Sequence, residues 1–178
     1  MRSVAILMLV FVTRAYASCD SDPDGTNEQV FFQSCKSGET IVVNSVALFH
    51  DDGSNNYPID VTHPVTLRLN MTNTGKTPLD KITISASVAR YTDIFGICSW
   101  IGIPTFDLLD NLDGCNYGST NICPMPPGVT VVNDRIDPAS VQAIINILST
   151  SEPYRITLSF KSGGAEVTCV TAEGKISK

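Results

Sequence analysis

Alternation of apolar and polar residues over short stretches is the feature that most restricts what this chain can fold into. Between residues 65 and 71 every odd position is apolar and every even position is polar, and residues 82–88 and 154–160 repeat the pattern with apolar even positions. A period of two residues is typical of a β-strand with one face buried and the other in water. These three stretches therefore predict half-buried strands.

Further strands are predicted at residues 41–49, 129–132 and 166–171, where β-branched residues are frequent. Turn-forming residues such as Gly, Asn, Asp and Pro fill residues 51–56, 73–78 and 161–164. Short strands separated by such turns predict an all-β fold, an antiparallel β-sandwich. The tryptophan and tyrosine signature of adhesion-type immunoglobulin domains is missing around the cysteines.

Two segments do not follow the strand pattern. Residues 95–112 are long, apolar and aromatic, and they include Trp100, the single tryptophan. In residues 137–149, Asp137 can cap a helix, Pro138 suits its first position, and Val141, Ile144, Ile145 and Leu148 recur at helical spacing. The second segment predicts one short amphipathic helix.

The first residues predict a signal peptide. Arg2 is followed by an apolar run at residues 4–12 and by the small-residue cleavage site Ala15-Tyr16-Ala17. That run is too short for a membrane-spanning helix, which needs about 20 residues. We therefore expect cleavage after residue 17, a single domain at residues 18–178, and a secreted, extracellular protein.

The charge of the mature chain restricts its partners. Removal of residues 1–17 leaves ten basic against eighteen acidic side chains, a net charge of −8. Nucleic-acid binding relies on a basic face, so we expect no nucleic-acid partner.

All six cysteines lie beyond the expected cleavage site: Cys19, Cys35, Cys98, Cys115, Cys123 and Cys169. An even number in an oxidising compartment predicts three disulfides, although the count alone allows 15 pairings. Zinc is the competing interpretation, but no Cys-x2-Cys pair is present.

Other chemical motifs are incomplete. Residues 20–25 match the first half of a calcium loop, but Phe31 stands where the bidentate glutamate is needed. His50-Asp51 resembles a phospholipase dyad, yet it lies at a strand end, and no Gly-x-Ser-x-Gly elbow is present. We therefore expect no enzyme, metal site or cofactor. Asn70 begins the one glycosylation sequon and falls on the polar face of its strand.

The order of these features resembles the ML (lipid-recognition) domain family, closest in style to the ganglioside activator and the lysosomal sterol carriers. The resemblance rests on Phe32-Gln33-Ser34-Cys35, Pro64-Val65-Thr66-Leu67, Gly114-Cys115, Cys123-Pro124 and the terminal Cys169. It implies an immunoglobulin-like sandwich whose sheets splay around an apolar cavity. It also implies disulfides Cys35–Cys169 and Cys115–Cys123, which leaves Cys19 and Cys98 to pair outside the simplest family pattern.

The resemblance further implies a lipid ligand, such as a sterol, fatty acid, phospholipid or glycolipid, transient membrane contact, residence outside the cell or in lysosomes, and a lipid-processing enzyme or receptor as partner. The alternatives are a secreted, filled-core β-sandwich that acts as a protein-interaction or immune-recognition module and, more remotely, a secreted lipid hydrolase. Residues on the apolar strand faces are expected to line the cavity, and those of the two unusual segments to form its lip or, alternatively, to cap the sandwich core. The expected strand-face residues are Val46, Leu48, Leu67, Leu69, Ile82, Ile84, Val88, Ile156, Leu158 and Phe160, and the expected lip residues are Phe95, Trp100, Phe106, Leu109, Ile144, Ile145 and Leu148.

Overall fold

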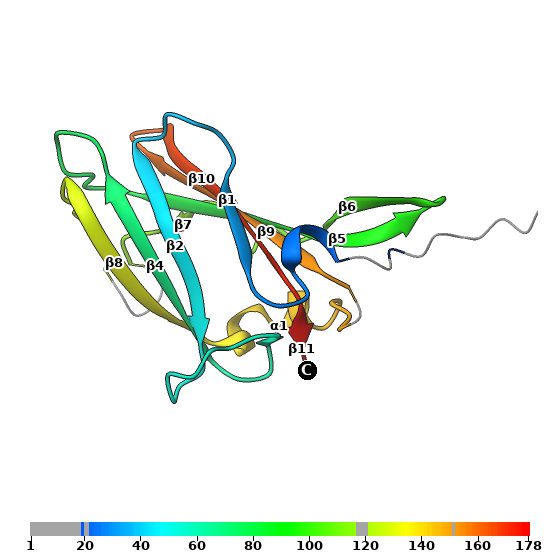
Figure 1. Ribbon diagram of the computed structural model, residues 1–178. Coiled ribbons are helices and arrows are strands. Elements are labelled where there is room, and N and C mark those ends of the chain that lie inside the picture. Colours follow the sequence, from blue (N-terminus) through cyan, green and yellow to red (C-terminus); the bar gives the residue numbers. More distant parts are fainter. Residues whose placement is uncertain (1–18, 20–21, 117–120, 151) are drawn as a thin grey trace, which may run out of the picture.

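The structure, a computed structural model, describes residues 19, 22–116, 121–150 and 152–178 (Figure 1). The predicted signal peptide lies outside the described residues. Two antiparallel sheets face each other as a β-sandwich, which confirms the fold class expected from the alternation (Figure 1).

The smaller sheet has the order β2-β4-β8 and consists of β2 (Ile41–Phe49), β4 (Val65–Asn73) and β8 (Gly128–Ile136). The register of β4 against β8 runs without a shift from the pair Val65 and Ile136 to the pair Asn73 and Gly128. β8 extends well beyond the predicted residues 129–132 because it pairs along the whole of β4. In β4 the apolar face is largely buried, as the period of two requires.

The larger sheet has the order β1-β10-β9-β5-β6, with β7 also paired to β5. Its strands are β1 (Phe31–Ser34), β5 (Thr83–Ile94), β6 (Ile97–Ile103), β7 (Leu112–Asp113), β9 (Tyr154–Ser162) and β10 (Ala165–Gly174). The expectation that residues 95–112 lie outside the strand pattern is wrong for β6. That strand pairs with β5 through a turn in which Phe95 and Gly96 have positive φ angles of 55° and 85°.

The predicted helix is shorter than residues 137–149. A 3-10 turn, η2 (Pro138–Val141), leads into a single α-helical turn, α1 (Gln142–Ile145). The Asp137 side chain accepts a hydrogen bond of 2.9 Å from the backbone nitrogen of Ala139, so the predicted cap is present. The β-branched residues of this segment disfavour a longer helix, and its shape is set by packing against the sheets.

Three minor elements complete the described fold. A 3-10 turn, η1 (Pro23–Gly25), lies near the amino end, and β3 (Ile59–Asp60) pairs in parallel with β11 (Ile176–Ser177). In Figure 1, β11 and α1 lie near each other at the end where the two sheets diverge.

Three disulfides hold the fold: the two that the family resemblance implies, and the remaining pair, Cys19–Cys98. Cys35–Cys169 joins the end of β1 to β10. Cys115–Cys123 closes a short loop between two cysteines that are eight positions apart in the sequence. Cys19–Cys98 ties the amino-terminal segment to β6. β2 of the smaller sheet contacts β1 and β10 of the larger sheet, so the two sheets approach each other along this side.

Buried apolar residues form two separate clusters in place of one continuous core. The first, hereafter the closed-end cluster, includes Ile41, Met71, Ile82, Met125 and Phe160 and packs against the Cys115–Cys123 disulfide. The second, the open-end cluster, is built on Val88, Tyr154 and Ile176. A filled sandwich would join these clusters through interdigitating side chains.

Candidate functional site

An apolar cavity of about 350 Å³ lies between the two sheets. β4 supplies Val65, Leu67, Leu69 and Met71 to its lining. The facing sheet supplies alternate residues of β5 and β9, namely Ile84, Ala86, Val88, Tyr154, Ile156, Leu158 and Phe160. The alternation that builds the strands therefore also builds the apolar wall.

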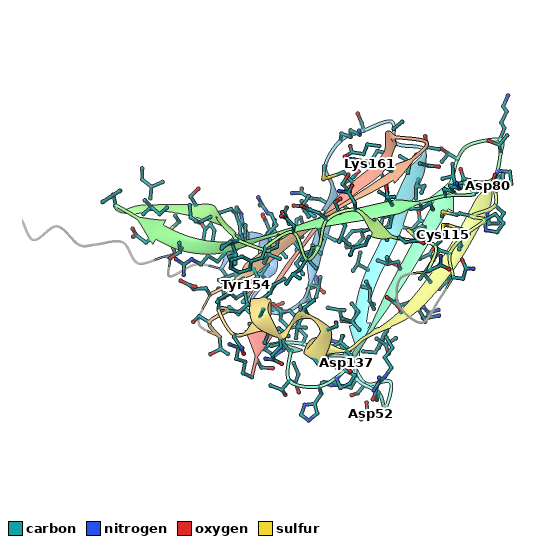
Figure 2. The ribbon with its side chains drawn as sticks, turned by 180° about the vertical axis from the view of Figure 1, so that it is seen from behind. Asp52, Asp80, Cys115, Asp137, Tyr154 and Lys161 are labelled. Atoms are coloured by element: carbon teal, nitrogen blue, oxygen red, sulfur yellow. A yellow bond between two sulfur atoms is a disulfide. The ribbon has the colours of Figure 1, made fainter. Side chains whose placement is uncertain are left out.

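The cavity occupies the space between the two buried clusters. Leu69, Met71 and Phe160 of the closed-end cluster line one part, and Val88, Tyr154 and Ile176 of the open-end cluster line another. Figure 2 shows Tyr154 and Asp137 at the side where the sheets spread apart, far from Cys115 and Asp80. The sheets are thus held together beside the disulfide loop and spread around the cavity.

The helical turn covers part of this wider side. Pro138, Val141, Ile144, Ile145 and Leu148 all line the cavity. Ile144 is 4% exposed and Ile145 is 8% exposed, so this segment buries its apolar side toward the cavity. The spacing of apolar residues seen in the sequence therefore identifies the side of the segment that faces the cavity.

Few polar groups reach the lining. Asp134, Tyr154 and Glu173 are the polar or charged residues among the lining residues of the described chain, and the Glu173 side chain points to the opposite face of the larger sheet, where Arg155 lies. The Tyr154 hydroxyl accepts a hydrogen bond of 2.5 Å from the backbone nitrogen of Ser149, and burial raises the pKa of Tyr154. A cavity with so few polar groups can hold a ligand mainly by excluding its hydrocarbon from water.

Glu173 is the most deeply buried carboxylate at the edge of this site. It lies opposite Arg155 on the neighbouring strand, and the Arg155 guanidinium donates to its Oε1 at 2.7 Å. The pKa of Glu173 lies above its usual value: burial is the largest influence and raises it, the Arg155 guanidinium lowers it, and nearby Asp24 raises it. The amino-terminal segment that carries Asp24 is held in turn by an ion pair of 2.5 Å between Asp22 and Lys175.

The structure places thirteen of the seventeen expected ligand-contacting residues on the cavity lining. The four that it does not place there are Ile82, Phe95, Trp100 and Phe106. Ile82 is 1% exposed and packs within the closed-end cluster. Phe95 and Phe106 are 99% and 66% exposed, so neither covers the cavity. Of the residues expected at the lip, those of the helical turn and Leu109 line the cavity, whereas these aromatic residues do not.

Trp100 lies on the side of the larger sheet opposite to the cavity. Its ring centroid is 5.2 Å from that of Tyr91, the residue paired with it on β5. The Arg155 guanidinium carbon lies 4.2 Å from the centroid of the Trp100 ring, a cation–π distance. This arrangement braces the base of the β5–β6 hairpin and explains why Trp100 does not reach the cavity.

Several lining residues come from segments without a strand pattern in the sequence. Val30, Ile59, Val61, Ile136 and Ile176 close the wider side together with the helical turn. The spacing of Ile59 and Val61 was a weak signal, since two alternating residues are too few to indicate a strand. The parallel pairing of β3 with β11 brings Ile59 and Ile176 together at the cavity.

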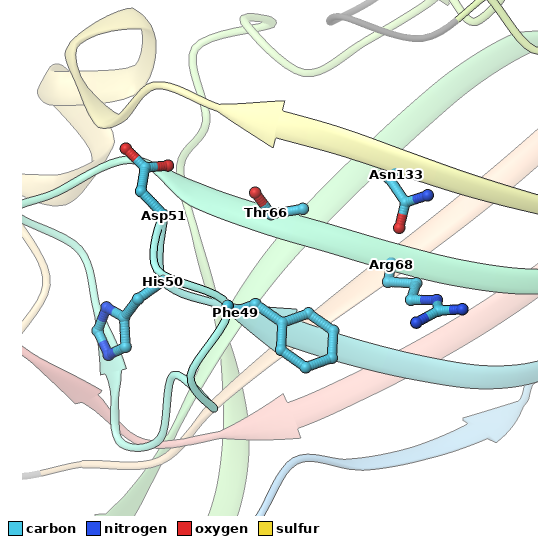
Figure 3. Close-up of a pocket in the computed structure, with 7 residues that line it drawn as sticks. Phe49, His50, Asp51, Thr66, Arg68 and Asn133 are labelled. Carbon is cyan, nitrogen blue, oxygen red and sulfur yellow. The ribbon is translucent and has the colours of Figure 1, made fainter.

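A second, shallow groove lies on the outer face of the smaller sheet (Figure 3). It has a volume of about 310 Å³ and is lined by Phe49, His50, Asp51, Gly53, Thr66, Arg68 and Asn133. The Asp51 carboxylate is held by the Arg135 guanidinium at 2.8 and 3.0 Å, which lowers the pKa of Asp51. The carboxylate of the suspected His50-Asp51 dyad is therefore engaged in an ion pair.

Asn70 of the glycosylation sequon and the described residues of the partial calcium loop, 22–25, are not among the residues that line the cavity. Asp20 and Ser21 of the partial calcium loop lie outside the described residues, and within the described ones no cluster of metal-ligating side chains is found. The Asn70 side chain accepts a hydrogen bond of 3.1 Å from Asn44 on the outer face of the smaller sheet. In the described part of the chain, no helix is long and apolar enough to cross a membrane.

The fold and the cavity define a splayed β-sandwich with an apolar interior site. No family model matches the sequence, and no curated protein matches it. Among solved structures, the chain is similar to a Niemann-Pick type C2 protein from the Japanese carpenter ant, with a TM-score of 0.50 and 13% identity over 83% of this chain and 99% of that one. It also matches the C-terminal domain of wzt, with a TM-score of 0.45 and 10% identity over 86% of this chain and 81% of that one. The first likeness shows that the two proteins share a fold.

Proposed function

We propose that this protein is a secreted carrier of the ML type, which holds the hydrocarbon part of a lipid in the cavity between its sheets. The observation that carries the proposal is the apolar cavity of about 350 Å³ that separates two buried clusters. Its volume falls at the lower end of the range of small-molecule sites, about 300 to 1,000 Å³. This size favours a sterol or a single acyl chain inside, with any polar headgroup at the wider side.

The energetic case follows from the lining. Each methylene group moved from water into such a site contributes about 0.8 kcal/mol, so a chain of ten buried methylenes gains on the order of 8 kcal/mol before the cost of association. Fatty-acid affinity should therefore increase with chain length until the cavity is full. A filled-core interaction module would show no such dependence.

Secretion is supported by separate observations. The predicted signal peptide and three disulfides fit an oxidising compartment outside the cytosol. The fold shared with a Niemann-Pick type C2 protein and the sequence resemblance to the ML family support carriage of lipid. We assign no covalent chemistry to the site, because its lining is apolar.

The test is direct binding to the purified, disulfide-bonded protein. Saturated fatty acids of increasing length and cholesterol should displace a fluorescent fatty acid, and organic extraction followed by mass spectrometry should recover bound lipid. Leu67→Trp and Leu158→Trp, which place bulk in the cavity from opposite sheets, should reduce this binding at least tenfold. Thr157→Trp, on the opposite face of β9, is the matched control. Equal binding by the cavity variants and the control would place the ligand elsewhere.

A further inference from the structure

The β5–β6 hairpin ends in an exposed apolar tip formed by Ile94, Phe95 and Ile97. Figure 1 shows the hairpin extending beyond the rest of the larger sheet. At its tip Ile94 is 37% exposed, Phe95 is 99% exposed and Ile97 is 70% exposed. Scattered exposed apolar residues are ordinary on soluble proteins, but three gathered on one projecting turn mark an interaction site.

Hydrogen bonds within the hairpin and a disulfide next to the tip fix its conformation. The Gly96 nitrogen donates a hydrogen bond of 2.7 Å to the Asp93 carboxylate, and Ile94 pairs directly with Ile97 across the turn. One position further back, Cys98 is linked to Cys19. These constraints prevent the turn from folding its apolar side chains back onto the sheet.

The base of the hairpin is braced as well. Trp100 packs between Tyr91 and the Arg155 guanidinium, as described above, while Ile103 packs against the open-end cluster. The hairpin is therefore a fixed arm, with a braced base at one end and an apolar tip at the other.

The area and charge of the tip decide which partner it fits. A specific protein interface buries about 800 Å² on each side, more than three side chains on a narrow turn can supply. A bilayer needs only a small apolar anchor, because aromatic and aliphatic side chains enter the boundary between headgroups and acyl chains. Asp93 is the only charged residue between positions 92 and 99, and the whole chain carries a net charge of −6, so an anionic surface is disfavoured.

We propose that the tip of the β5–β6 hairpin inserts into zwitterionic phospholipid bilayers and docks the protein on them. β5 is continuous from this tip to Val88, Ala86 and Ile84 on the cavity wall, so one strand joins the docking point to the binding site. The benefit of docking rests on the proposed lipid-carrying function, whereas the docking itself is measured without any cargo.

The experiment is cosedimentation with phosphatidylcholine vesicles at physiological salt. The double variant Phe95→Ser and Ile97→Ser should bind vesicles at least tenfold more weakly than the wild type. The matched control is Val129→Ser with Val131→Ser, which removes two exposed apolar residues from β8, where they are 67% and 43% exposed. The control should bind within about twofold of the wild type, and both variants should retain their melting temperatures.

A second measurement locates the contact. The indole introduced by Phe95→Trp should shift its emission to the blue on vesicles and be quenched by brominated phosphatidylcholine, above the background from Trp100. No vesicle binding by the wild type, equal binding by the tip variant, or an unquenched indole would overturn the proposal. Fatty-acid binding measured on the same proteins separates the two claims. A wild-type protein that docks on vesicles but binds no fatty acid would contradict the proposed function and leave the docking proposal standing.

Discussion

Replacing Ile144 with Ala tests whether the helical turn borders a cavity or a filled core. Ile144 is 4% exposed and lines the cavity, whereas Ile82 is 1% exposed and packs within the closed-end cluster. The two side chains are chemically identical and both are buried. They differ in whether protein atoms or open space lie against them.

The expected costs follow from that difference. Truncating a buried isoleucine to alanine destabilises a protein by about 2 to 5 kcal/mol, depending on how many packing contacts are lost with the side chain. Ile144 already faces open space on one side, so its truncation should cost about 2 kcal/mol. Ile82 is surrounded, so Ile82→Ala should cost about 4 kcal/mol, toward the upper part of that range.

Urea unfolding with the disulfides intact measures the difference. With a slope of about 2 kcal/mol per molar urea, the two variants should differ in midpoint by about 1 M while sharing one slope. Saturating fatty acid should also stabilise the wild type, since a ligand that binds only the native state raises its stability. An equal loss of unfolding free energy in the two variants, with no stabilisation by fatty acid, would refute the reasoning. It would show that the helical turn packs against a filled core.

Three further predictions concern charge and covalent structure. The pKa of Glu173 is raised in the folded state, so the folded protein keeps this proton to a higher pH than the unfolded chain. The free energy of unfolding should therefore fall as the pH rises above about 4.5. Glu173→Gln should make this fall smaller when unfolding is measured at several pH values. Hydrogen bonds from Thr62 lower the pKa of Asp60 from 3.8 to about 2. The contribution of Asp60 to folding stability is therefore present above pH 3.8 and is lost as the pH falls toward 2. Asp60→Asn should reduce the loss of stability in this acid range. Removing the Cys35–Cys169 disulfide, which spans 134 residues, should cost about 5 kcal/mol in the entropic model, measured by urea unfolding of the double alanine variant. A loss below about 2 kcal/mol would contradict that estimate.

The strands that form the cavity walls could be read from the sequence because their environment is regular. In β4 and β9 one face meets apolar groups and the other meets water, so the alternation is preserved along the strand. The predicted bounds of β2, residues 41–49, also match the structure, although that prediction rested on frequent β-branched residues and not on alternation.

β6 could not be recognised because its environment is not regular. The apolar residues of β6 lie on both faces of a projecting hairpin. Trp100 lies on one face and contacts Arg155, whereas Ile97 and Ile103 lie on the other face, where Ile103 packs against the open-end cluster. With apolar residues on both faces, the period of two disappears. The long apolar stretch then resembled a lip.

The division between cavity and core was also hidden in the sequence. Ile82 and Ile84 occupy equivalent places in one alternating pattern, yet Ile82 packs in the closed-end cluster and Ile84 lines the cavity. What separates them is the distance between the sheets at each position. That distance depends on contacts made by β2, the disulfides and the helical turn, none of which the local pattern encodes.

The division of the buried apolar residues into two clusters has a mechanical consequence. An unfilled volume disappears when a protein unfolds, so hydrostatic pressure favours the unfolded chain in proportion to that volume. The empty form of this protein should be soft to compression between its sheets, while its closed end beside the Cys115–Cys123 disulfide stays rigid. A ligand that fills the cavity would remove this softness, so the filled and empty forms would differ in compressibility while keeping the same strands and pairing.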